Sequence, residues 1–289
     1  MRLSLRRSFS ARPIRAFSVG VAALLAAAGF ALTSTGASGA TTARTSPART
    51  AKVPKLSHQL CYTSAARGFT IPGGVRLYNQ FSPHGFVPKI GRAIMNCNPV
   101  IKTVSVPSTG KTRTYPITDP AGHLACFSIT ERPQKTPAPI ALRNQFGTGT
   151  LYLSRAFLLC LPTWKSLTKP PSHRTSQPAG LDHFTCYLAQ GPNTFVIPPV
   201  VKLQDEFDRK PVIATVSPLA NIVCAPTRKT VNGKVYKILH PLNLLVCYPV
   251  QPTPIRPRVY DQNQFGHATV IIKRTQELCL PSVRANAPG

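Results

Sequence analysis

Short apolar segments with a period of two recur along the chain, each just before an Asn-Gln-Phe-like triplet. They lie at 75–77, 140–142, 200–203 and 258–260, and β-branched or alternating segments follow two of the triplets at 150–153 and 269–272. Alternation with a period of two is typical of strands with one buried face. We therefore expect three or four short strands around each triplet.

Helical periodicity of useful length occurs only near the N-terminus, in residues 16–32. In the rest of the chain, 30 prolines and 18 glycines, counted over the whole sequence, interrupt the pattern too often for long helices. The sequence therefore predicts an all-β fold.

Eight cysteines divide the chain into four units with the same landmarks. A cysteine followed by an aromatic residue opens each unit, the triplet lies in the middle, and Cys-x-Pro ends it. The units run over Cys61–Cys97, Cys126–Cys160, Cys186–Cys224 and Cys247–Cys279. Because the chain carries an export-type N-terminus, an even number of cysteines predicts disulfides rather than free thiols. Pairing within each unit is favoured, and the rival pairs Cys97–Cys126 and Cys224–Cys247 stay open.

The triplet is interpreted as structural. Its phenylalanine is expected to anchor a core, and its first residue, Asn or Asp, is expected to form a turn by bonding its own backbone. The four phenylalanines are Phe81, Phe146, Phe207 and Phe265.

The units alternate in type, which predicts two tandem modules. Units one and three are alike after their closing cysteine, whereas units two and four share Asn-Gln-Phe-Gly and Cys-Leu-Pro. We expect two small β-sandwich or Greek-key-like modules at 58–167 and 181–284, joined by a Pro/Ser-rich linker at 168–180. Within the second module, Asn232-Gly233 between β-forming residues predicts a hairpin.

Residues 1–40 have the form of an export signal, with five arginines, an apolar segment over 16–32 and then small residues. That segment is too short and too rich in alanine and glycine to favour a retained membrane anchor. General and twin-arginine export both stay open. We expect a disordered basic tail at 41–57, a short tail at 285–289, and a protein that is released or held non-covalently at the cell surface.

The charge is strongly positive, with 35 basic and 8 acidic residues and a net charge of +27. Residues 1–40 hold five of the basic and none of the acidic residues, so the exported chain keeps 30 and 8 and a net charge of +22. Such a surface attracts anionic polymers, among them cell-wall polymer, polysaccharide and nucleic acid. The basic residues are scattered along the chain, so the charge can also serve solubility alone.

Recognisable catalytic chemistry is absent from the sequence: it has no Gly-x-Ser-x-Gly, no His-Glu-x-x-His and no glycine-rich phosphate loop. Asp205, Glu206 and Asp208 are the one carboxylate cluster, for which a solvated turn is the favoured interpretation. Histidines precede the opening cysteine by three residues in three units, at His58, His123 and His183. These histidines suggest zinc only as an alternative, because a thiol in a disulfide cannot bind metal. We expect no catalytic residue, metal or cofactor.

The unit pattern resembles that of a family of secreted bacterial repeat proteins, in which a unit runs His-x-x-Cys-aromatic, then Asp/Asn-Gln-Phe-Gly, then Leu-Cys-x-Pro. His123–Phe127, Leu142–Gly147 and Leu159–Pro162 match it well, and the likeness covers most of 58–282. Units one and three lack the glycine after the phenylalanine, and unit four lacks the histidine. The resemblance implies an extracellular β-rich module. That family has no assigned activity, so it implies no functional residues.

Three functions are compatible with these features. The first is a secreted, non-enzymatic protein whose cationic surface binds anionic polymers at or outside the cell envelope. The second is a protein-interaction or adhesion module that uses exposed strand edges. The third is a secreted hydrolase with a cleft between the modules, which would need Asp205, Asp208, His183 or His240 to converge.

Overall fold

The computed structural model describes residues 56–106, 110–131, 139–191, 195–196, 198 and 200–285. These residues belong to one compact unit, Ser46–Gly289. They form sixteen β-strands in a single antiparallel sheet and no helix, which confirms the all-β prediction. The predicted signal at 1–40 and most of the predicted tail at 41–57 lie outside the described residues, as do residues 286–289.

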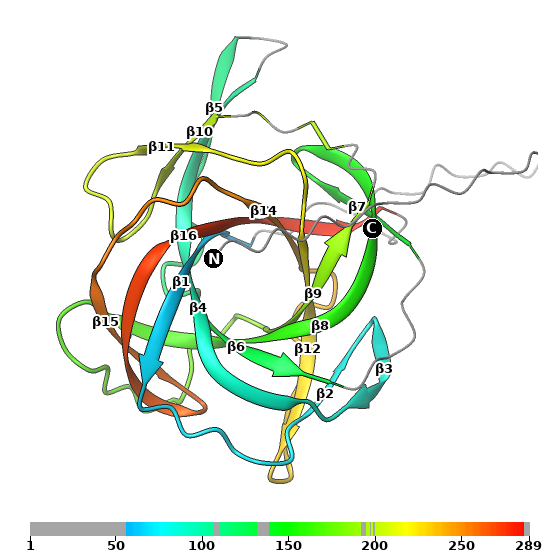
Figure 1. The fold of residues 1–289 in the computed structure, drawn as a ribbon, viewed down its shortest axis with the longest axis vertical. Coiled ribbons are helices and arrows are strands. Elements are labelled where there is room, and N and C mark those ends of the chain that lie inside the picture. Colours follow the sequence, from blue (N-terminus) through cyan, green and yellow to red (C-terminus); the bar gives the residue numbers. More distant parts are fainter. Residues whose placement is uncertain are drawn as a thin grey trace, which may run out of the picture. The chain divides into compact units, whose positions relative to one another are not determined.

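Eight strands form a closed ring that encircles the centre of Figure 1. Each unit contributes its opening strand and its closing strand to this strand ring. The opening strands, which carry the first cysteine of each unit, are β1 (His58–Arg67), β6 (His123–Thr130), β9 (His183–Gln190) and β14 (Leu244–Pro249). The closing strands, which carry the second cysteine, are β4 (Lys89–Val106), β8 (Gly147–Ser166), β12 (Ile222–Val231) and β16 (Gly266–Arg284).

The ring closes because every strand in it pairs with two neighbours. The order is β1, β4, β6, β8, β9, β12, β14 and β16, and β16 pairs back onto β1. A sheet closed on itself needs no edge strand. Since side chains alternate between the two faces of a strand, the cysteines point inward and the residues that follow them point outward.

The strand before each triplet crosses to the unit on the opposite side of the strand ring. These middle strands are β2 (Arg76–Asn79), β7 (Ile140–Asn144), β10 (Val200–Gln204) and β15 (Arg258–Asn263). In units one and three, β2 pairs with β12 and β10 pairs with β4. Units two and four make the same exchange, with β7 on β16 and β15 on β8.

Four further strands complete hairpins on the outside. They are β3 (Ser82–Phe86), β5 (Lys111–Tyr115), β11 (Val212–Thr215) and β13 (Lys234–Tyr236), which pair with β2, β4, β10 and β12. The β12–β13 turn is the predicted Asn-Gly turn, with φ of 47° at Asn232 and 74° at Gly233. A two-residue hairpin of this type requires positive φ at both positions, so the hairpin prediction is confirmed.

The predicted division into two sandwich modules is not confirmed. The predicted linker at 168–180 connects β8 and β9, which pair with each other, and β16 pairs with β1. The physical reason is that two units supply only half of the strand ring, and each half would leave two unpaired edges. Those edges pair with the other half, so strands from both predicted modules share one sheet.

Apolar side chains form two separate cores. The inner core fills the strand ring and contains all eight cysteines with Met95, Leu124, Leu158, Phe184 and Ile222 among others. The outer core lies on the other face of the ring strands, under the middle strands, and includes Phe146 and Phe265, with Phe81 and Phe207 packed against it.

Candidate functional site

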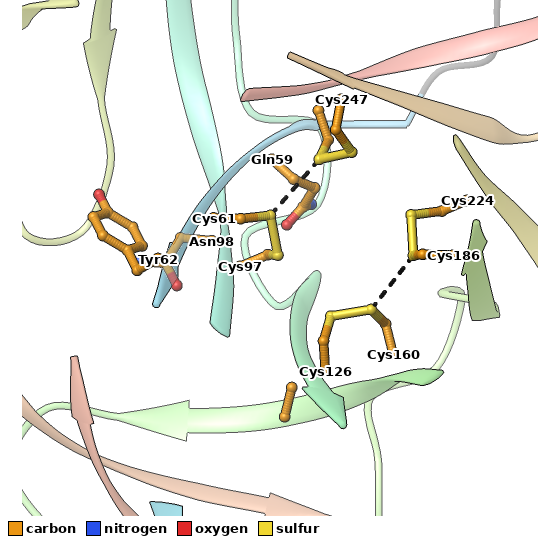
Figure 2. The surroundings of a disulfide bond; sticks show 12 residues. Gln59, Cys61, Tyr62, Cys97, Asn98, Cys126, Cys160, Cys186, Cys224 and Cys247 are labelled. Atoms are coloured by element: carbon orange, nitrogen blue, oxygen red, sulfur yellow. Dashed lines mark hydrogen bonds between the residues drawn. A yellow bond between two sulfur atoms is a disulfide. The ribbon is translucent and has the colours of Figure 1, made fainter. Parts of the chain in front are cut away.

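Four disulfides lie at the centre of the strand ring, and they are the within-unit pairs Cys61–Cys97, Cys126–Cys160, Cys186–Cys224 and Cys247–Cys279. Each joins directly opposed residues of two neighbouring strands. Figure 2 shows them gathered in the interior, with Tyr62 on the other side of β1. Sulfur atoms of neighbouring disulfides are in contact, at 3.8 Å between Cys61 and Cys279.

The interior of the strand ring is closed to ligands. The cavity lined by the cysteines has a volume of only 10 Å³. A single water molecule needs about 10 to 15 Å³ of such volume. The disulfides therefore act as packed core.

The triplets form the expected turns. The first residue of each triplet accepts a hydrogen bond from the backbone N–H of its phenylalanine, at 2.8 to 2.9 Å in all four units. These residues are Asn79, Asn144, Asp205 and Asn263, and all four are buried.

The same four residues also bind the opposite unit, which the sequence did not indicate. Asn79 Nδ2 donates to the Tyr187 hydroxyl at 3.0 Å, and Asn144 Nδ2 donates to the Tyr248 hydroxyl at 3.0 Å. In each case the tyrosine is the residue that follows an opening cysteine. The tyrosine that follows an opening cysteine thus bonds to the triplet turn of the unit on the opposite side of the strand ring.

The tyrosine contact is made in both directions between units one and three, but in only one direction between units two and four. The Tyr62 hydroxyl donates to Asp205 Oδ2 at 2.7 Å. The residue after the opening cysteine of unit two is Phe127, which has no hydroxyl, and Asn263 Nδ2 donates instead to Thr163 Oγ1 at 3.2 Å. An edge-to-face contact between Phe127 and Phe265, at 4.9 Å between ring centroids, preserves the packing.

The three predicted histidines are buried in separate places. His58 packs against Tyr115, and His183 Nε2 lies 3.1 Å from Gln264 Oε1. Burial lowers the pKa of both His58 and His183 to about 3, so they are neutral at pH 7. His123 Nδ1 lies 3.8 Å from a Glu206 carboxylate oxygen.

The alternative zinc sites do not form. Every cysteine of the chain is in a disulfide. Across the described ranges, no three His, Cys, Asp or Glu side chains are grouped as metal ligands. The physical reason is that the ring strands turn each cysteine inward while its histidine lies in the outer layer.

A repeated buried lysine was missed by sequence reasoning. The fifth residue after the closing cysteine is Lys102, Lys165, Lys229 and, in unit four, the exposed Arg284. Lys102 and Lys229 are fully buried, and their Nζ atoms lie over aromatic rings without a hydrogen-bond partner. The column is visible in the sequence, but lysine is ordinarily a surface residue, so its pattern did not suggest burial.

The acidic cluster of unit three is only partly brought together. Asp205 and Glu206 line a cavity with His123, but Asp208 does not line it. His183 and His240 do not line it either, and His240 pairs with Asp182 at 3.3 Å. The convergence needed for the hydrolase hypothesis is therefore not seen around this cavity.

A basic groove of 1160 Å³ lies between the end of β1 and the start of β4. Five basic side chains line this basic groove, and all are exposed: Arg67, Arg92, Arg258, Lys273 and Arg274. None of the described residues that line it is acidic. The hydroxyl oxygens of Thr63 and Ser64, which also line it, have no hydrogen-bond partner.

The basic groove forms because β1 and β4 separate. They pair only as far as Thr63 opposite Met95. Beyond this point β1 pairs with β16 alone and β4 pairs with β6, and bulges interrupt both of these ladders. Bulges bend and twist a strand, so the two strands diverge and leave a gap that the arginines surround.

The positive charges of the basic groove come from three parts of the chain, namely β1, β4 and the consecutive strands β15 and β16. Like charges around one concave surface raise the local potential, and they attract an anion with several charges more strongly than one with a single charge.

Among the described residues, no helix has the length and hydrophobicity to cross a membrane. No protein-family model matches the chain, and no curated protein or solved structure matches it, so its resemblance to the secreted repeat family stays a prediction.

Proposed function

We propose that this is a secreted, non-enzymatic protein that binds linear anionic polymers through the basic groove, at or outside the cell envelope. The observation that carries the proposal is the set of five exposed basic side chains around one groove with no acidic lining residue. The four disulfides support an oxidising compartment, where such bonds persist.

The shape of the groove favours an extended chain over a compact ligand. It is bounded by two diverging strands, and basic side chains lie on both: Arg67 on β1 and Arg92 on β4. Arg258, Lys273 and Arg274 continue the positive charge along β15 and β16. Guanidinium groups bind phosphate, sulfate and carboxylate oxygens through paired hydrogen bonds, so the proposal extends to polymers that carry any of these groups.

The test is the salt dependence of binding to three probes, namely labelled single-stranded DNA, polyphosphate and heparin, measured by fluorescence anisotropy. If all five basic groups contact DNA phosphates, the slope of log K against log salt is about −3.5, and affinity falls by about two orders of magnitude between 50 and 200 mM salt. Binding to DNA should not depend on base sequence. An affinity that is the same at low and high salt would refute the proposal.

A matched pair of variants separates the groove from the net charge. Arg92→Gln with Arg274→Gln removes two groove charges, and Arg209→Gln with Lys210→Gln removes two exposed charges from the turn after β10. The groove variant should lower the salt slope to about −2. The control variant should leave the slope unchanged. Equal effects from both variants would mean that only the total charge matters.

The strand edges of the groove favour a second candidate function. Residues 64–67 of β1 and 89–94 of β4 face each other without forming a ladder. An extended segment of a partner protein could pair with such an edge. A partner that binds with the same affinity at low and high salt, and whose binding survives the Arg92→Gln and Arg274→Gln changes, would favour this protein-interaction function.

A further inference from the structure

At each of five buried or partly buried positions, one unit has a different kind of residue from the other three. Around the closing cysteine, unit one has Asn96 and Asn98 where the others have apolar residues. In the triplet, unit three has Asp205 and Glu206 where the others have Asn and Gln. Two residues before the triplet, unit four has Asp261 where the others have leucine.

These departures from the repeat converge around Lys165, although they come from three different units. Lys165 Nζ contacts Asn98 Oδ1 and lies 3.1 Å from Glu206 Oε1. Asn98 Nδ2 donates to Asp205 Oδ2 at 2.8 Å, and the Tyr62 hydroxyl donates to the same oxygen. The positions of Asn98 and Tyr62 beside β1 and β4 are visible in Figure 2.

The fourth and fifth departures complete the network. Asn96 Nδ2 donates to Asp261 Oδ2 at 2.6 Å. Asp261 is fully buried, and burial raises its pKa to about 6 although Lys165 opposes the rise. A core position that holds a leucine in three units therefore holds a carboxyl group in the fourth, and its burial costs folding free energy that the hydrogen bond from Asn96 and the charge of Lys165 only partly offset.

A cavity of 260 Å³ opens beside this network. Its apolar walls are Pro99, Ile101, Ile117 and Pro120. Its polar lining is Gln204, Asp205, Glu206 and His123. His123 is buried, its pKa is lowered well below 6.5 by burial, and its Nδ1 has no hydrogen-bond partner.

The charges around the cavity are not balanced. The carboxyl groups of Asp205 and Glu206 line the cavity, whereas no described lysine or arginine does, and Lys165 pairs with Glu206 from outside the lining. Apolar walls with one such charged edge suit a ligand that combines an apolar group with a positive charge. We infer that this cavity binds a small organic cation, of the class of aryl-alkyl primary amines, through the Glu206 carboxylate beside the unpartnered His123.

A second place in the chain has the same arrangement of side chains without the carboxylate. His58 and Lys102 of unit one and Phe146 of unit two are arranged as His123, Lys165 and Phe207 are, but a glutamine, Gln145, takes the place of Glu206. The fold thus accepts glutamine next to a buried lysine. Glu206→Gln is therefore expected to fold, and it changes the charge of the cavity while keeping its shape.

The test compares three probes of similar size, namely benzylamine, benzyl alcohol and benzoate, by ligand-observed NMR titration of the exported full chain. Benzylamine should bind at least about tenfold more tightly than benzyl alcohol, because a charge-assisted hydrogen bond is stronger than a neutral one. Benzoate should bind most weakly. Glu206→Gln should weaken benzylamine about tenfold and change benzyl alcohol less than twofold.

Two controls keep the result specific to the cavity. Asp208→Asn removes a neighbouring carboxyl group that does not line the cavity, and it should change benzylamine affinity less than twofold. Ile117→Trp fills the cavity without altering its charges, and it should abolish binding of both benzylamine and benzyl alcohol. The inference is overturned if benzyl alcohol binds as tightly as benzylamine, if Glu206→Gln leaves benzylamine unchanged, or if no probe binds at millimolar concentration.

Discussion

Replacing Lys102 with methionine should make the protein more stable at neutral pH and remove part of its pH dependence. Lys102 is fully buried in β4, and its Nζ lies 4.5 Å from the ring centroid of Phe146 and 4.8 Å from that of Tyr115. It has no hydrogen-bond partner. Burial and then the positive charge of Arg113 lower the pKa of Lys102 from 10.5 to about 6.

The sign follows from proton binding. Between pH 6 and 10.5 the unfolded chain holds a proton on this lysine and the folded chain does not, so acidification favours unfolding. The free energy of unfolding therefore rises with pH by about 1.4 kcal/mol per unit, or about 3 kcal/mol between pH 7.5 and 9.5. Lys229, whose pKa burial lowers to about 7, adds a similar slope. Lys102→Met should thus halve the slope of the wild-type protein.

Guanidinium unfolding at pH 7.5, 8.5 and 9.5, followed by the fluorescence of the single tryptophan, Trp164, measures this slope. All eight cysteines are bonded, so no free thiol starts disulfide exchange at alkaline pH. The matched control is Lys202→Met, since Lys202 is exposed on β10. If Lys102→Met and the wild type have parallel pH profiles, Lys102 stays protonated in the folded protein and the reasoning is wrong.

Three further predictions concern the fold. Tyr248→Phe leaves the buried Asn144 amide without its partner and should lower the free energy of unfolding by about 1 to 3 kcal/mol in urea titration, and no change would show that the bond across the strand ring does not form. Replacing both Cys247 and Cys279 by alanine opens a loop of sequence separation 32 and should cost about 3 to 4 kcal/mol in the same assay, whereas an unchanged midpoint would contradict the disulfide. Burial raises the pKa of Glu277 from 4.5 to about 7, so the contribution of this group to stability is lost as pH rises through that window. The buried neutral histidines His58 and His183 act in the opposite direction, so Glu277→Gln should make the free energy of unfolding rise more steeply with pH between 4.5 and 7 than in the wild type, and parallel profiles would contradict the shift.

Local features could be predicted from the sequence because neighbouring residues determine them. Asn232-Gly233 forms its hairpin, and the first residue of each triplet bonds its own backbone, as in Asn144 to Phe146. The cysteine spacing led to the within-unit disulfides, although the rival pairs fitted the same spacing. These inferences needed only turn chemistry and a period of two.

The closed ring could not be predicted, because a period-two pattern shows which face of a strand is buried but not which strands pair with its edges. Nothing in β16 identifies β1 as its neighbour. The basic groove depends on the same pairing, because Arg67 and Arg274 meet only when the ring closes. The network around Lys165 could not be predicted either. Each departure from the repeat is visible in the sequence, but these residues come together only because the middle strands pair with the opposite unit.

The pairing of β16 with β1 has a consequence for how the polypeptide reaches its native state. Cys279 lies opposite Gln59, so the seam joins the two ends of the folded region. High contact order of this kind slows folding, and an N-terminal fragment emerging from the ribosome or translocon has no seam to close. Synthesis must therefore include β16 before cooperative folding can begin, and chains truncated before β16 should be degraded rather than accumulate as stable half-molecules.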